Sequence, residues 1–543
     1  MKQAIKLLLF LLCVGAYETG HAYRPDTHRA IAEQAAKPEV SHVDQILKDE
    51  LGIPDGIDSI FKEKTLQKWL GEGAALEDWP PSRVTHHFHN PFMPWESAGK
   101  TLLLGSQSSI VWQQSAEQLS SLDAWGVGLE RGWPSARRYY EQALTAGAPT
   151  DREQWFAETF RTLGNAVHLI QDASVPAHTR DDAHIVVGPD KDPYERWAEY
   201  ARLGEETDIC STGGLHCFFA FLNQSPDYPA EELLTAPYAN SLAPVPIARL
   251  IDSDTYTGAL VPSLLTGFNI GLAEYSNANF VSADTIFTDF PLPRTEGLGA
   301  GTFEPEEGGY RRYFPKLATD GEPVQRFVAE GVWYERLEQN QTPPLRGGYV
   351  LTNKVHEGYA RKLLPRAVGY SAGLINYFFR GKIAVVDDSQ NPGSRVIKNE
   401  GSELLKGTFT LYYDDVDGKR HPVDPDPNDS TKAKPWPTPE AGLAKDQTMP
   451  LPALAPPSVP APKTPGEYML VFQGDMGEEK AIAVAARKIN LPTSFLLYTS
   501  LGTYRPRPYH EWNTFGRRWL GEIGRWWVGI LGDGVLCARP PLA

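Results

Sequence analysis

The sequence "HLIQDASVPAH", from His168 to His178, decides how the first two thirds of this chain are interpreted. His168 and Asp172 are four residues apart, so a helix places both side chains on one face, within reach of the same cation. Pro176 disfavours helical geometry at the residue before it, so we expect the helix to end there and His178 to lie beyond it. Imidazole and carboxylate groups are ligands that suit zinc, and the stretch therefore predicts a metal site. The alternative is a solvated helix end with a capping aspartate and a surface histidine.

Apolar residues recur at helical spacing on both sides of this stretch. Residues 151–173 and 353–379 each carry apolar side chains three and four positions apart, which predicts two long amphipathic helices. Pro365 should kink or split the second helix. Residues 205–350 are rich in proline and glycine and give only a weak pattern. The fold that we predict for residues 23–380 is a mainly α catalytic domain.

The pattern changes to alternation after Gly381. Residues 381–500 contain short runs of β-branched and aromatic residues such as "GTFTLYY", separated by turns, which predicts a small antiparallel β-sandwich domain. The segment 421–465 holds 13 prolines in 45 residues, so we expect an extended, exposed insertion there. Residues 501–543 form a tryptophan-rich C-terminal tail, which could pack back onto the body.

The N-terminus has the pattern of an export signal. Lysines precede the apolar run Leu7–Val14, and a cut after Ala22 would remove residues 1–22 and leave Tyr23 first; a cut after Ala16 is the alternative. No later segment has the roughly 18 apolar residues of a membrane-spanning helix. We therefore expect a secreted or periplasmic protein.

Charge and cysteine content narrow the function further. The net charge of −16 argues against a stable nucleic-acid partner, because phosphate contacts need clustered lysine and arginine. Bound metal ions would still attract a phosphate substrate locally. Cys210 and Cys217 are expected to form a local disulfide in an exported protein, with two reduced thiols as the alternative, and Cys537 has no predicted role.

Further candidate ligands lie upstream of the opening stretch. The sequence "HHFHNP" places His86, His87 and His89 close together, shortly after the acidic pair Glu77 and Asp78. Histidines at this density are typical of a metal site, and the alternative is an exposed polar loop. We expect at least one of them to join the opening stretch around a cation.

Taken in order, these residues resemble the superfamily of zinc-dependent phospholipases C and single-strand-specific nucleases. That superfamily is mainly helical, secreted and built around three clustered zinc ions. The matching positions are Tyr23, His28, Asp78, His87, Phe88, His168, Asp172, Pro176 and His178. They lie within residues 23–200, about a third of the chain, and the β region is outside the resemblance.

The resemblance implies a ligand set for two to three Zn²⁺ ions. The implied ligands are Tyr23, His28, Asp78, His87, His168, Asp172, His178, His184 and Glu195. Tyr23 would bind through its amino group and carbonyl oxygen, and Asp172 would bridge two ions. In the third site this chain has Lys191 where the family has a histidine, so either His184 replaces it or the third ion is weak or absent. Glu77 remains the alternative to Asp78.

The resemblance also implies a reaction. A metal-bridging hydroxide would attack phosphorus in a phosphodiester, and Asp78 would orient the attacking water or act as the base. A phospholipid is favoured over single-stranded nucleic acid because the chain is acidic, with transient contact at a membrane surface. Trp79 and Trp95 could stack on a nucleic-acid base or simply pack.

An alternative from a different class is a non-catalytic binding protein that zinc stabilises. The departure at Lys191 is its best argument, since structural zinc sites are closed to water. Glu199 shares a helix face with Glu195 and is a weaker ligand candidate, with a solvated helix face as the alternative.

Overall fold

The computed structural model describes most of the chain. The described residues are 25–79, 81–99, 107–115, 118, 130–182, 192–203, 221–229, 233, 246–306, 309–331, 348–452, 460–491, 527–531 and 534–538. The predicted signal peptide, Tyr23, His184, Lys191 and the predicted Cys210–Cys217 disulfide lie outside them. Among the described residues, no helix is both long and apolar enough to cross a membrane.

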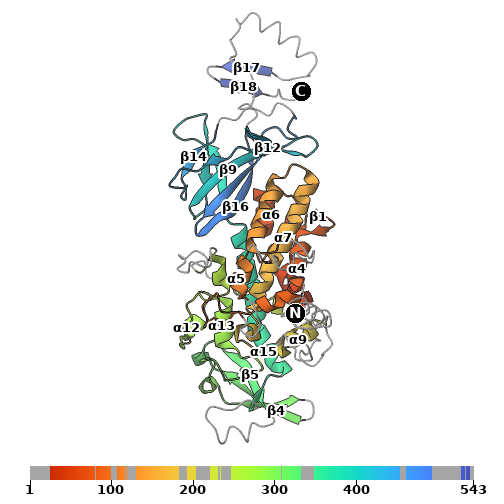
Figure 1. The fold of residues 1–543 in the computed structure, drawn as a ribbon, viewed down its shortest axis with the longest axis vertical. Coiled ribbons are helices and arrows are strands. Elements are labelled where there is room, and N and C mark those ends of the chain that lie inside the picture. Colours follow the sequence, from red (N-terminus) through yellow and green to blue (C-terminus); the bar gives the residue numbers. More distant parts are fainter. Residues whose placement is uncertain are drawn as a thin grey trace, which may run out of the picture. The chain divides into compact units, whose positions relative to one another are not determined.

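The chain divides into two compact units. The first consists of Met1–Ala453 and Pro457–Leu491, and the second of Leu454–Pro456 and Pro492–Ala543. In the second unit, β17 (Trp527–Leu531) pairs antiparallel with β18 (Gly534–Ala538). The predicted packing of the tryptophan-rich tail concerns residues that lie mostly outside the described part. All other elements belong to the first unit (Figure 1).

The N-terminal part of the first unit is built from helices, as predicted. The α-helices are α2 (Pro25–Ala35), α3 (Val43–Gln45), α4 (Leu66–Ala75), α5 (Ser109–Gln114), α6 (Trp133–Thr145), α7 (Pro149–Asp172), α8 (Pro176–Thr179), α9 (Pro193–Leu203), α12 (Pro262–Leu265), α13 (Leu272–Asn279) and α15 (Asn353–Phe378). Short 3-10 or π turns are η1 (Ile46–Glu50), η2 (Gly56–Asp58), η3 (Pro81–His86), η5 (Pro246–Leu250), η6 (Thr295–Gly297) and η7 (Ala318–Asp320). A two-residue hairpin, β1 (Ile60–Phe61) with β2 (Lys64–Thr65), precedes α4.

Two prolines act differently in the long helices. The helix α7 ends at Asp172, and Pro176 occupies the first turn of α8, so the predicted break before His178 is confirmed. The helix α15 continues through Pro365, so of the two predicted effects of this proline, a kink or a split, the split does not occur. Nearly all of α15 around Pro365 is buried, and this packing outweighs the roughly 3 kcal/mol cost of an interior proline.

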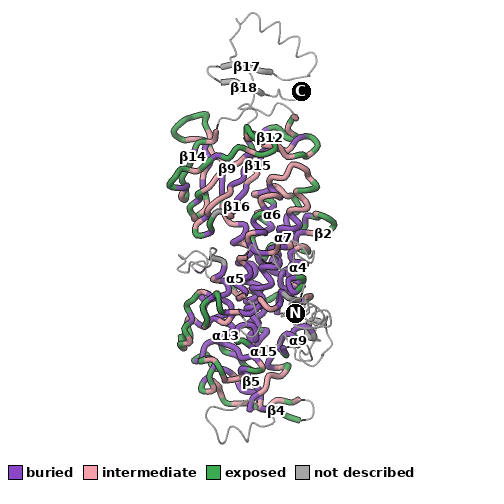
Figure 2. Tube along the Cα trace, viewed as in Figure 1, coloured by how far each residue is buried: buried purple, intermediate pink, exposed green. Residues whose placement is uncertain are grey.

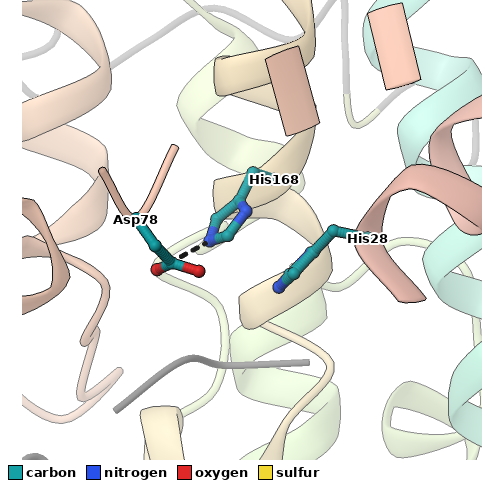
Figure 3. A group of neighbouring side chains, drawn as sticks. All are labelled: His28, Asp78 and His168. Carbon is teal, nitrogen blue, oxygen red and sulfur yellow. Dashed lines mark ion pairs between the residues drawn. The ribbon is translucent and has the colours of Figure 1, made fainter. Parts of the chain in front are cut away.

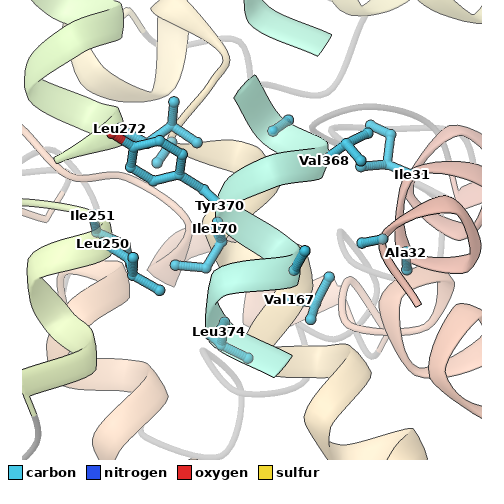
Figure 4. Packing of buried hydrophobic residues seen from close by; sticks show 14 of the residues in the cluster. Ile31, Ala32, Val167, Ile170, Leu250, Ile251, Leu272, Val368, Tyr370 and Leu374 are labelled. Carbon is cyan, nitrogen blue, oxygen red and sulfur yellow. The ribbon is translucent and has the colours of Figure 1, made fainter. Parts of the chain in front are cut away.

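The core of the helical part forms where α15 packs against α2 and α7. Figure 4 shows Val167 and Ile170 of α7 near Leu374 of α15, and Val368 of α15 beside Ile31 of α2. All five side chains are fully buried. The buried residues run through the helices and into the adjoining sheet, while the exposed residues concentrate in loops (Figure 2). The histidine-bearing helix α7 is therefore held rigidly from several sides.

A four-stranded antiparallel sheet interrupts the helical part, and sequence patterns did not predict it. Its strands, in the order in which they pair, are β3 (Thr302–Glu306), β4 (Gly309–Lys316), β5 (Val324–Glu330) and β6 (Tyr349–Val350). The hydroxyl of Tyr359 on α15 donates to the Phe327 carbonyl oxygen at 3.0 Å, joining helix to sheet. The region to residue 380 is mainly helical, as predicted, and this sheet is an addition that the weak pattern of residues 205–350 did not indicate.

Two antiparallel sheets form the C-terminal part of the first unit, and the strand predictions there are confirmed. One sheet has the order β10 (Arg420–Pro422), β9 (Leu405–Asp414), β15 (Glu467–Met476), β16 (Glu479–Asn490), with β13 (Trp436–Pro437) also paired to β9. The other has the order β14 (Thr448–Pro450), β8 (Arg395–Asn399), β7 (Ile383–Asp387). A separate hairpin joins β11 (Pro425–Asp426) to β12 (Asp429–Ala433).

The described part of the proline-rich segment 421–465 is mostly exposed, as predicted, but it also pairs with the two sheets. It contributes β13 and β14 to the edges of the two sheets, and Trp436, Leu443 and Met449 are buried. Proline is tolerated at a sheet edge because its missing N–H would face away from the ladder. Prolines such as Pro437 and Pro450 are thus placed where a strand needs no further partner.

A buried ionic network joins the helices to the larger sheet. Glu479 of β16 accepts from Arg137 Nε of α6 at 2.8 Å and from Trp133 Nε1 at 2.9 Å. Arg380, just after α15, donates to the same carboxylate at 2.7 Å. Burial opposes ionisation, but Arg137 and Arg380 hold the pKa of Glu479 down to about 2. The carboxylate is therefore charged and links three elements.

Candidate metal centre

Four histidines and three carboxylates from separate elements meet inside the helical part. They are His28 of α2, Asp78 after α4, His87 after η3, His168 and Asp172 of α7, His178 of α8 and Glu195 of α9. Each of these seven residues is at most 3% exposed. Of the nine predicted ligands, the remaining two, Tyr23 and His184, lie outside the described residues.

The first group consists of His87, His168 and Asp172, whose ligand atoms lie within 4.8 Å of one another. Asp172 Oδ2 is 3.2 Å from His168 Nε2 and 3.0 Å from His87 Nδ1. The two imidazole nitrogens are 3.3 Å apart. One turn of α7 thus places His168 and Asp172 on one face, as their spacing predicted, and His87 completes a three-ligand arrangement.

The second group consists of His28, Asp78 and His168, and Figure 3 shows the three side chains facing one another. Asp78 Oδ1 lies 3.6 Å from His168 Nε2 and 3.2 Å from His87 Nδ1. The rings of His28 and His168 stack with centroids 3.7 Å apart, and His28 Nε2 lies 3.5 Å from Asp172 Oδ1. His168 therefore belongs to both groups, and Asp172 of the first group also lies close to His28 of the second.

A third pair adjoins these groups. His178 Nε2 lies 3.0 Å from Glu195 Oε1. The His178 ring stacks on Phe88 with centroids 4.6 Å apart, next to His87 in the sequence. The family resemblance assigns this pair to a third site together with His184, which lies outside the described residues.

Each of the four imidazoles has one ring nitrogen bonded to an acceptor outside the cluster. The pairs are His28 Nδ1 with Gln171 Oε1, His87 Nε2 with Glu77 Oε2 (2.8 Å), His168 Nδ1 with the Ala74 carbonyl oxygen (2.7 Å) and His178 Nδ1 with the His87 carbonyl oxygen (3.2 Å). Because every one of these partners is an acceptor, that ring nitrogen carries the proton. The other nitrogen of each ring then presents its lone pair to the neighbouring carboxylates.

Lone pairs facing carboxylate oxygens repel each other unless a cation lies between them. The pKa shifts within the cluster also indicate that a positive charge is stabilised there. Burial lowers the pKa of His168 and His87, yet nearby carboxylates, including Asp172 beside both, reverse that effect and raise the pKa of each. Burial would raise the pKa of Asp172, but His168 and His87 hold it well below its usual range. Nitrogen and carboxylate donors in this arrangement fit Zn²⁺.

His28 is neutral in the folded protein. Burial, reinforced by the neighbouring His168 imidazole, lowers the pKa of His28 to about 3, although Asp172 and Asp78 act in the opposite direction. A neutral imidazole is the form that binds a metal ion. His28 is therefore prepared as a ligand at every pH near neutrality.

Only one of the three histidines in "HHFHNP" joins the centre. His86 stacks on Trp112 and its Nδ1 accepts from the Gln107 backbone N–H at 2.8 Å. His89 Nε2 bonds to Asp252 Oδ2 at 2.7 Å, away from the cluster. Sequence patterns did not separate these roles, since each depends on a partner at least 21 residues away along the chain.

Within the acidic pairs Glu77–Asp78 and Glu195–Glu199, the two members of each pair have different surroundings. Glu77 lies between Arg83 and the outer nitrogen of His87, while Asp78 lies beside His87 Nδ1 and His168 Nε2 inside the cluster, so Asp78 and not Glu77 lies with the candidate ligands. Glu199 is buried on α9, which corrects the alternative of a solvated face. Gln171, which bonds to His28, was not predicted, and nothing in its local sequence singles it out.

Comparisons with known proteins give little similarity. No family model matches the chain, and no curated protein matches it. Among solved structures it is similar to alpha-toxin from an avian strain of Clostridium perfringens, at 10% identity over 87% of this chain and 100% of that chain, with a TM-score of 0.20. Alpha toxin from Clostridium absonum is similar at 10% identity over 87% of this chain and 97% of that chain, with a TM-score of 0.24.

Proposed function

We propose that this chain is an exported zinc-dependent hydrolase of phosphodiesters, resembling the zinc-dependent phospholipases C. The single observation that carries the proposal is the set of four buried imidazoles, each protonated toward an outer acceptor and each presenting its second nitrogen to Asp78, Asp172 or Glu195. A structural role would need one closed set of four ligands, whereas this cluster supplies seven.

Zinc, when bound, lowers the pKa of a coordinated water and neutralises phosphate oxygens. The side chains of this protein determine where the ions and the attacking water would be held. His168 and Asp172 lie between the two groups and hold them together. Asp78 lies at 3.2 Å from His87 and at 3.6 Å from His168, with its carboxylate available to orient an attacking water and to accept its proton. We assign Asp78 as the catalytic carboxylate and the outer acceptors as the groups that fix ligand orientation.

Two tryptophans near the centre differ in access to substrate. Trp95 is 1% exposed and part of the core, so its role is packing. Trp79, directly after Asp78, is 48% exposed and offers an aromatic surface to a cationic head group or to a nucleic-acid base. The net charge of −16 disfavours a long polyanion, so we propose a phospholipid as substrate, with a single-stranded nucleic acid as the competing candidate.

The test combines metal content with two substrates. Purified protein is assayed for zinc per chain and for release of phosphate esters from phosphatidylcholine vesicles and from single-stranded DNA, with and without a chelator. We expect two to three zinc ions per chain and chelator-sensitive cleavage of phosphatidylcholine.

Each other outcome decides between the alternatives. Cleavage of the DNA alone would make the protein a nuclease of the same superfamily. Tightly bound zinc with neither substrate cut would favour a non-catalytic zinc-stabilised protein. Absence of zinc in protein that begins at Tyr23 would overturn the proposal.

A further inference from the structure

Glu77 is a buried carboxylate beside the candidate centre that the proposed reaction does not use. Its Oε2 accepts from His87 Nε2 at 2.8 Å, and its Oε1 accepts from Trp112 Nε1 at 3.1 Å. Arg83 Nη2 also donates to Oε1, and Arg83 Nε donates to the Glu77 carbonyl oxygen at 2.8 Å. Both Glu77 and Arg83 are fully buried. The carboxylate is thus held from three directions.

The contact with His87 determines which of its nitrogens faces the cluster. His28, His168 and His178 turn Nε2 inward, since their Nδ1 atoms donate to outer acceptors. His87 is the reverse, because its Nε2 donates to Glu77 and its Nδ1 lies 3.0 Å from Asp172. Among the described ligands, His87 alone depends on a charged outer partner that is itself anchored by an arginine.

We propose that Glu77, anchored by Arg83 and Trp112, is a positioning residue that fixes His87 with Nδ1 toward the metal and strengthens it as a ligand. This inference rests on the proposed zinc centre and adds to it a residue that determines metal affinity. An anionic acceptor makes an imidazole a stronger donor than a neutral acceptor does, and it restricts rotation of the ring. Burial favours the neutral form of Glu77, but Arg83 and then His87 hold its pKa well below the usual range.

The chain contains a matched control for this arrangement. Glu479 is also a fully buried carboxylate that accepts from an arginine, Arg137, and from an indole N–H, that of Trp133. The side-chain partners of Glu479 among the described residues are Trp133, Arg137 and Arg380, and no histidine is among them. Loss of charge at Glu77 and at Glu479 should therefore perturb folding in similar ways, and only the change at Glu77 should alter metal binding.

The experiment measures the zinc affinity of the full chain by competition with a chromogenic chelator, in wild type, Glu77→Gln and Glu479→Gln. We expect Glu77→Gln to weaken zinc binding by about 10- to 100-fold, as for other outer partners of metal-binding histidines. We expect Glu479→Gln to retain the wild-type zinc affinity while lowering the melting temperature of the metal-free protein. Substitution of Co²⁺ for zinc gives a second readout, since its visible absorption changes with ligand geometry.

A milder variant keeps the test decisive if Glu77→Gln does not fold. Trp112→Phe removes one hydrogen bond to Glu77 while retaining a ring beside His86, and it should weaken zinc affinity in the same direction by a smaller factor. Wild-type affinity and an unchanged Co²⁺ spectrum in the folded Glu77 or Trp112 variant would overturn the inference. If the wild type binds zinc but cleaves no phosphodiester, and Glu77→Gln still weakens zinc binding, the inference stands and only the proposed reaction fails.

Discussion

Gly73 of α4 and Gly164 of α7 touch where the two helices cross. A Cβ atom on Gly164 would lie 2.9 Å from the Gly73 Cα and 2.2 Å from the Leu70 carbonyl oxygen. A Cβ atom on Gly73 would lie 1.8 Å from the Arg161 carbonyl oxygen. Because these obstacles are backbone atoms, only glycine allows this approach. The approach brings the Ala74 carbonyl oxygen to His168 Nδ1, so helix packing contributes directly to the candidate metal centre.

Substitution of Gly164 by alanine should therefore damage both the fold and the site. We expect Gly164→Ala to lower the free energy of unfolding by about 1–3 kcal/mol, because the helices must separate to admit the methyl group. Zinc content should fall in parallel, since Ala74 and Asp78 move with α4. Urea unfolding and metal analysis check this. Gly147→Ala is the control, since its nearest neighbouring atom would be 3.6 Å away, and it should change neither quantity.

The candidate ligands His168 and Asp172 connect the two groups, so we expect their loss to be severe. We expect His168→Ala and Asp172→Asn each to lower zinc-dependent hydrolysis more than about 100-fold, with loss of bound zinc. Removal of zinc from the wild type by a chelator should lower its melting temperature, because a ligand that binds only the folded state stabilises it. Wild-type zinc content in Asp172→Asn would contradict the ligand assignment.

His356 of α15 predicts a pH dependence of stability that is independent of zinc. It is buried beside Tyr194 and Trp197 of α9, and burial lowers its pKa to about 3. Between pH 6.5 and pH 3 the unfolded chain protonates this histidine and the folded chain does not. Stability therefore falls as the pH is lowered below 6.5, by at most about 1.4 kcal/mol per pH unit.

The measurement is urea unfolding of chelator-treated protein at pH 7 and pH 5, in wild type and in His356→Leu. The variant should lose less stability than the wild type between these two pH values, whatever its absolute stability. Equal losses would show that His356 titrates alike in both states. His28 contributes in the same direction in metal-free protein, and it is present in both chains compared.

The ionic network at Glu479 should matter more than any surface ion pair. Glu479→Gln leaves the buried Arg137 and the half-buried Arg380 with reduced compensation, and we expect a loss of about 3–5 kcal/mol in the free energy of unfolding. Glu467→Gln breaks the surface pair with Lys488, whose side chains are each about a third exposed, and should cost less than about 1 kcal/mol. Similar losses from both variants, measured by urea unfolding, would contradict the structural role assigned to Glu479.

Sequence patterns correctly predicted those features that depend only on residues close together in the chain. The shared face of His168 and Asp172 follows from helix periodicity, and the helix end before His178 follows from Pro176. Strand alternation after Gly381 likewise predicted β7, β9 and β15, since period two depends only on neighbouring residues.

Partners distant in the chain were decided only by the tertiary structure. The sequence names His87 and Asp78 as candidates, but it does not show that Glu77 bonds to Arg83 and to the outer nitrogen of His87, or that His89 bonds to Asp252. The sheet from β3 to β6 and the continuous helix through Pro365 also escaped prediction, because burial against other elements outweighs local propensity. The sequence alone therefore shows which residues are candidates for the centre. Which of them come together, and which nitrogen each imidazole turns inward, depends on packing between helices far apart along the chain.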